Sequence, residues 1–158
     1  MLLGSGTAAQ SGAKHDEMKL YEAAVRYIIA GEVSYAAECL WRITRRDIHI
    51  LYSRALCYFA AGHFRECFNL LTEAEARLSP DPASPRCAPD AVLQWEYRSD
   101  FHLSPMMEDA PECIKALQIL RMKAECSAKL GLDSELNDIN AALNCRYRHI
   151  NNLIGRNG

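Results

Sequence analysis

Proline is missing from most of this chain. All six prolines lie between Pro80 and Pro111 of the 158 residues, so helices elsewhere need not be broken by proline rings. No apolar run approaches the roughly 18 residues that span a bilayer, and the first nine residues lack the basic and apolar regions of a signal peptide. We therefore expect an intracellular protein, cytoplasmic or nuclear, with no membrane partner.

An excess of charge of one sign is also missing. The 18 Lys and Arg residues nearly balance 20 Asp and Glu residues, which gives a net charge of -2. Such a balance makes binding to a nucleic-acid backbone unlikely. The exception is residues 144–158, where Arg146, Arg148 and Arg156 meet no acidic residue. An RNA-binding helical adaptor that uses Arg146 and Arg148 therefore stays open as an alternative.

The motifs of common enzymes are absent. The chain has no nucleophile elbow, no His-Glu-x-x-His, no phosphate-binding loop and no calcium loop. We expect no enzymatic activity and no cofactor.

The cysteines do not form a recognisable framework. There are seven, an odd number, with no Cys-x-x-Cys spacing, which is typical of reduced thiols in a chain without a signal peptide. A helical hairpin could bring Cys57, His63 and Cys67 together, so a zinc- or thiol-dependent protein is a second alternative. Zinc would need a fourth ligand, and packing explains Cys67 equally well. We expect no metal site.

Helical periodicity dominates the first half of the chain. Apolar residues recur at steps of three and four over 18–30 and 33–43, and again over 48–78, which predicts helical hairpins at 16–46 and 47–78. The two hairpins match at a constant offset of 31 residues, with small residues opposite small ones and large opposite large. The pairs are Leu20/Leu51, Ala24/Ala55, Tyr27/Tyr58, Gly31/Gly62, Ala36/Cys67 and Leu40/Leu71.

The remaining segments are less regular. We expect residues 1–15 to form a flexible leader, because they are rich in Gly, Ser and Ala without apolar periodicity. The acidic, proline-rich residues 79–110 are too long for an ordinary connection and predict an insertion. A short helix in it would let Trp95 and Phe101 dock on the domain. Residues 111–154 predict a degenerate third hairpin and a closing helix.

The matched pairs resemble those of the tetratricopeptide repeat (TPR) family. This resemblance implies an all-α, right-handed superhelix of antiparallel hairpins, with residues 16–158 as a single domain. It also implies a concave groove lined by the first helix of each hairpin. The groove-facing residues would be Tyr21, Val25, Ile28, Tyr52, Leu56 and Phe59.

These groove residues are apolar, whereas TPR proteins that clamp a C-terminal carboxylate carry Lys, Arg and Asn there. Exposed apolar groups are a liability in a monomer, and burying each large one contributes about 1.5–3 kcal/mol. Either another part of this chain or a second chain must cover the groove. We expect a protein partner: a second copy in a homodimer, or an apolar helix or peptide.

The overall layout resembles the N-terminal region of the TPR scaffold subunits of the anaphase-promoting complex, the ubiquitin ligase of the cell cycle. The similarity rests on two hairpins, an insertion, a divergent hairpin that begins Leu120-Arg121-Met122-Lys123, and a closing helix with Tyr147 and Asn152-Leu153. It covers about residues 18–154. Because those subunits homodimerise through their N-terminal grooves, the resemblance implies a non-catalytic, self-associating scaffold module that is part of a longer repeat protein or a reduced homologue.

Overall fold

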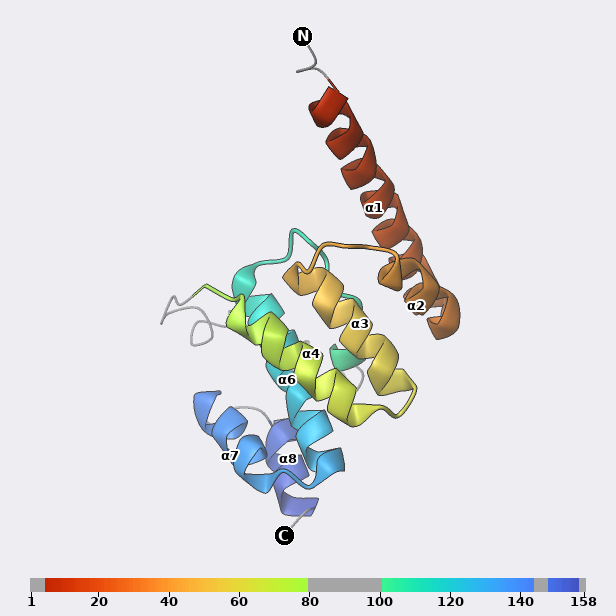
Figure 1. Ribbon diagram of the computed structural model, residues 1–158. Helices are drawn as coiled ribbons and strands as arrows, with labels where there is room; N and C mark the ends of the chain where they lie inside the picture. The colour runs from red at the N-terminus through yellow and green to blue at the C-terminus, as the bar shows by residue number, and fades with distance from the viewer. Residues whose placement is uncertain (1–4, 80–100, 144–147, 157–158) are drawn as a thin grey trace.

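The computed structural model describes the backbone of residues 5–79, 101–143 and 148–156, and the side chains of 11–79, 102–143 and 148–155 (Figure 1). These residues form seven α-helices and one 3-10 helix, with no strand, which confirms the all-α class. The elements are α1 (Ser5–Ala30), α2 (Val33–Trp41), α3 (Ile48–Ala60), α4 (Phe64–Ala76), η1 (Phe101–Leu103), α6 (Glu112–Leu130), α7 (Asp133–Ala142) and α8 (Arg148–Arg156).

Three helical hairpins end their first helix in the same way. Gly31, Gly62 and Gly131 have φ values of 79°, 80° and 68°, a left-handed conformation that glycine adopts without a Cβ penalty. At each turn the amide that follows the glycine donates to the carbonyl five residues earlier, which closes a Schellman motif. These bonds join Glu32 to Tyr27 (2.8 Å), His63 to Tyr58 (2.9 Å) and Leu132 to Ser127 (2.9 Å).

The small residues of the repeat are buried between helices. Ala24, Ala55 and Ala124 each lie seven residues before a turn glycine, and all three are fully buried. A methyl side chain allows neighbouring helices to approach closely. The third hairpin therefore keeps the turn, this small contact position and Leu120 in place of Leu20 and Leu51, whereas Ser127 replaces Tyr27 and Tyr58.

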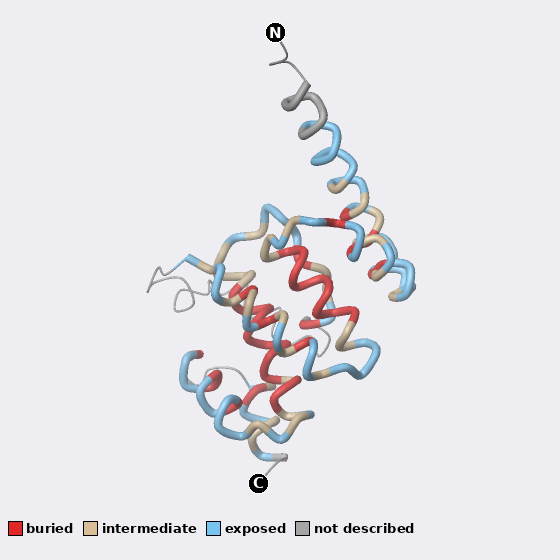
Figure 2. Tube along the Cα trace, in the orientation of Figure 1, coloured by how far each residue is buried: buried red, intermediate tan, exposed pale blue. Residues whose placement is uncertain are grey.

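Helix α6 connects two apolar cores. Its residues Ile119, Met122 and Cys126 pack into the core formed by α1 to α4. On another face, Leu117 and Leu120 pack with α7 and α8. Helices α3 and α6 are consequently buried along most of their length, as the continuous red stretches in Figure 2 show.

The first half of α1 differs from the expected leader. The helix begins at Ser5, and its residues 11–16 are exposed as it projects away from the other helices (Figures 1 and 2). Ala8, Ala9 and Ala13 favour the helical conformation here, since alanine has the highest helix propensity, while Gly6 and Gly12 oppose it.

Two arginines after α2 pair with carboxylates, one within the first hairpin and one on the second. Arg45 pairs with Glu17 of α1 (3.1 Å) and Arg46 pairs with Glu73 of α4 (2.5 Å). The hydrogen bond from Arg46 is the main reason that the pKa of Glu73 falls to about 2. Arg45 and Arg46 thus connect the loop after α2 to α1 and α4 through side-chain ion pairs.

Candidate functional site

A stretch of the chain that begins within the 3-10 helix η1 lies across α1, α3 and α6. Residues 102–108 run past these helices, and their carbonyl oxygens at every second residue accept a hydrogen bond from a helix side chain. The donors are Tyr52 to His102 (2.5 Å), Gln118 to Ser104 (3.2 Å), Tyr21 to Met106, and Lys115 to Glu108 (2.5 Å). We call Tyr21, Tyr52, Phe59, Lys115 and Gln118 the covered face, and residues 102–108 the covering segment.

Two side chains anchor the covering segment. Met106 is fully buried, and His102 is 6% exposed. The His102 ring meets the edge of Phe59, with centroids 5.3 Å apart, while Met106 belongs to the core of the first two hairpins. Leu103, between these two anchors, is 40% exposed, and Met107, directly after Met106, is 54% exposed. The segment therefore contacts the helices through its main chain and two side chains, and presents the others to solvent.

The six residues expected in an apolar groove are largely covered by the chain itself. Tyr21 and Tyr52 hold the covering segment through their hydroxyls, and Phe59 contacts it through its ring. The other three lie nearby in the same core: Ile28 and Leu56 are buried, and Val25 is half-buried. Of the two possible covers, the structure supplies the one from within the chain.

The covering segment falls at the end of the expected insertion. Trp95 lies outside the described residues, and Phe101 begins η1 with its side chain also outside them. Sequence reasoning missed His102, Met106 and Gln118. The available signal was the apolar pair Met106-Met107 within an otherwise acidic segment.

Burial keeps the two tyrosines in the form that the covering segment needs. It raises the pKa of Tyr21 to about 12 and that of Tyr52 well above its ordinary value of 10. A protonated phenol donates a hydrogen bond, whereas a phenolate only accepts. Both hydroxyls therefore remain donors to backbone carbonyls throughout the physiological pH range.

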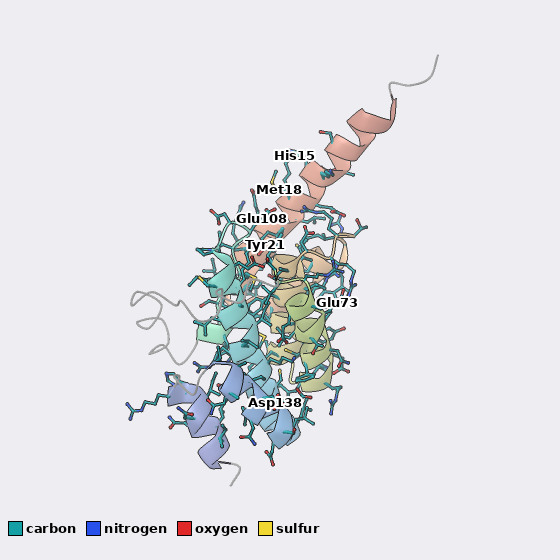
Figure 3. All side chains as sticks on the ribbon, turned by 90° about the vertical axis from the view of Figure 1, so that its left-hand side faces the viewer. His15, Met18, Tyr21, Glu73, Glu108 and Asp138 are labelled. Atoms are coloured by element: carbon teal, nitrogen blue, oxygen red, sulfur yellow. The ribbon has the colours of Figure 1, made fainter. Side chains whose placement is uncertain are left out.

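The His49 ring packs against the Tyr21 ring. The two rings meet edge to face with centroids 4.7 Å apart, and His49 is buried, with no hydrogen-bond partner on Nε2 among the residues that the structure describes. A shallow polar depression of about 410 Å³ borders it, with Asp47, Arg77, Glu108 and Lys115 among its lining residues. Figure 3 shows Tyr21, Met18 and Glu108 grouped beside the lower part of α1.

The stability of the domain is expected to fall as the pH drops below about 6.5. Desolvation lowers the pKa of His49 from 6.5, despite the opposing charges of Glu108 and Asp47 and with Lys115 and Arg45 also nearby. Because the unfolded chain then binds a proton that the folded chain rejects, stability is present above the unfolded pKa and is lost on acidification. Urea unfolding of the wild type and His49→Gln between pH 5 and 8 measures this, and the variant should show a shallower slope. Equal slopes would contradict it.

The zinc alternative finds no support in the geometry. The Cys57 sulfur lies 4.0 Å from the Val33 carbonyl, whereas Cys67 faces Cys126, and His63 packs against the Tyr58 ring. Within the part of the chain that the structure describes, no three His, Cys, Asp or Glu residues form a possible metal site. For the RNA alternative, Arg148 is exposed on α8, while Arg146 lies outside the described residues.

Comparisons with known proteins add no family. No protein-family model, no curated protein and no solved structure matches this chain. Among the described helices, none is both long and apolar enough to cross a membrane.

Proposed function

We propose that this chain is a non-catalytic protein-interaction module built from TPR-like hairpins. One observation carries the proposal: the covered face already binds a polypeptide segment, through hydrogen bonds to every second main-chain carbonyl and two buried side chains. Main-chain recognition with a few side-chain anchors is a recurring way in which proteins bind peptides. The three equivalent hairpin turns support the TPR-like part of the proposal.

More specifically, the module self-associates over this face. Leu103 and Met107 remain exposed on the covering segment, and Met18, one turn before Tyr21 on α1, is 43% exposed. Burying these three apolar side chains against a second copy would contribute about 1.5–3 kcal/mol for each. The second copy would contact the outside of the covering segment, because the face beneath it is filled.

The most specific version of the proposal places the module in a larger assembly. The order of two hairpins, an insertion, a divergent hairpin and a closing helix resembles the N-terminal region of anaphase-promoting-complex scaffold subunits. On this proposal the chain is the corresponding part of a ubiquitin-ligase scaffold. Its self-association would then be the first property to test, since it needs no other subunit.

Sedimentation velocity over a range of concentrations tests self-association. The wild type should become a dimer with increasing concentration, and the double variant Leu103→Glu/Met107→Glu should stay monomeric, because two charges would be buried at the contact. Ile29→Glu is the matched control: Ile29 is 72% exposed on α1 and outside this face, so its dimer should be unchanged. A wild type that is monomeric throughout would contradict the self-association.

A further inference from the structure

A sulfur cluster lies between α4 and α6. The sulfur of Cys126 is 3.3 Å from that of Cys67, which in turn is 3.6 Å from the thioether of Met122. Met122 and Cys126 are four residues apart on α6 and so share a face of the helix toward Cys67 on α4. All three side chains are fully buried. The contact joins residues 59 positions apart in the sequence, across the insertion.

The two thiols are close enough to bond with little rearrangement. A disulfide has a sulfur separation of about 2.0 Å, so the pair needs to approach by roughly 1.3 Å. Met122 contributes a flexible, unbranched neighbour that can adjust to the change. Within the described residues, this is the pair of cysteines in sulfur contact.

We propose that Cys67 and Cys126 form a site of reversible oxidation, at which hydrogen peroxide closes a disulfide between α4 and α6. One sulfur attacks peroxide, the O–O bond breaks, and a sulfenic acid and one water result. The other sulfur then attacks the sulfenic sulfur, the S–O bond breaks, and a second water leaves with the remaining proton. The two thiols lose two electrons and peroxide gains them.

Burial makes the oxidation slow. The hydrogen bond with Cys126, followed by burial, raises the pKa of the Cys67 thiol well above its ordinary value, and the thiolate is the reactive form. Peroxide is small enough to reach such a site during brief opening of the helices, where a bulky disulfide reagent is not. The product would fasten the second hairpin to α6, which directly follows the covering segment.

Peptide mapping of the native chain tests the proposal. The protein is treated with hydrogen peroxide, quenched with catalase, denatured in urea that contains iodoacetamide to block free thiols, and digested with trypsin. Residues 66–77 and 124–129 are tryptic peptides that carry Cys67 and Cys126 as their only cysteines. We expect them linked, with the loss of two hydrogens, and separated by reductant. The thermal midpoint of the oxidised protein should rise by about 5–10 °C.

Two controls make the outcome decisive. Cys57→Ala, which removes a buried cysteine of α3, should keep the 67–126 link, and Cys126→Ala should lose it. If the second variant does not fold, mapping of the wild type decides alone. The proposal is overturned if the two peptides are recovered alkylated and unlinked, if they carry only sulfinic or sulfonic acids, or if the link appears only when the chain is oxidised in urea.

Discussion

Replacing Met106 with alanine is expected to lower the free energy of unfolding by about 2–5 kcal/mol, whereas the same change at Met107 should alter it by less than about 0.5 kcal/mol. The two residues are adjacent and identical in type. Met106 is fully buried in the core of the first two hairpins, and Met107 is more than half exposed. Removing the Met106 side chain therefore leaves a cavity beneath the covering segment, while removing that of Met107 leaves none.

Urea unfolding followed by far-ultraviolet circular dichroism measures both Met→Ala variants against the wild type. The comparison is internally controlled, because helix content, charge and chain entropy change equally little in each. Similar losses at Met106 and Met107 would mean that the covering segment does not seat Met106 in the core. A large loss confined to Met106 would support the anchoring role.

Replacing Arg54 with methionine is expected to cost about 2–3 kcal/mol. Arg54 is buried, donates to the carbonyls of Leu40 (2.8 Å) and Ile43 (2.6 Å), and lies over the Trp41 ring at 5.7 Å. Hydrogen bonds from a charged donor contribute about 1.5–3 kcal/mol, and their loss leaves polar groups buried without a charged partner. Methionine keeps most of the side-chain volume, so the change reports chiefly on these bonds.

Arg65→Met provides the matched control for Arg54, since Arg65 is exposed on α4. Its unfolding midpoint in urea should match that of the wild type within about 0.5 kcal/mol. If Arg54→Met and Arg65→Met lower stability equally little, the hydrogen bonds from Arg54 to the carbonyls at the end of α2 contribute little to stability. The connection between the first two hairpins would then depend on apolar packing and on the pair between Arg46 and Glu73.

The local features of the fold could be predicted from the sequence. Gly31 and Gly62 mark their turns because a left-handed residue is needed there, and Ala24 and Ala55 mark the tight helix contacts because any larger side chain would separate the helices. These requirements act over a few residues, and therefore leave a regular pattern at the offset of 31. The start of α1 was harder, since an exposed helix carries no apolar period.

The third hairpin diverges where tertiary contacts replace the repeat pattern. Lys123 lies eight residues before the turn glycine, where the first two hairpins have Ala23 and Arg54. It is buried, with its ammonium 2.7 Å from Glu75 and 5.0 Å from the centre of the Phe68 ring. Ser127, in place of the usual aromatic, donates to the Lys123 carbonyl (2.8 Å). Both partners of Lys123 come from α4, far away in the sequence, so no local sequence pattern predicts these contacts.

The covering segment could not be predicted for the same reason. Tyr21 and Met106 are 85 positions apart, and Tyr52 and His102 are 50 apart. Their hydrogen bonds go to main-chain carbonyls, which every residue possesses, so side-chain identity gives almost no signal. The sequence did predict that the apolar face needs a cover, because apolar side chains exposed to water are unfavourable.

Exposure of the methionine methyl groups tests the covered face most directly. The chain has five methionines, and selective carbon-13 labelling of their methyls gives one signal each in a two-dimensional spectrum. The Leu103→Glu variant should be used, so that self-association does not shield Met107. With a soluble paramagnetic agent added, we predict that the signals of Met18 and Met107 broaden while those of Met106 and Met122 stay sharp. Broadening of Met106 equal to that of Met107 would contradict the account.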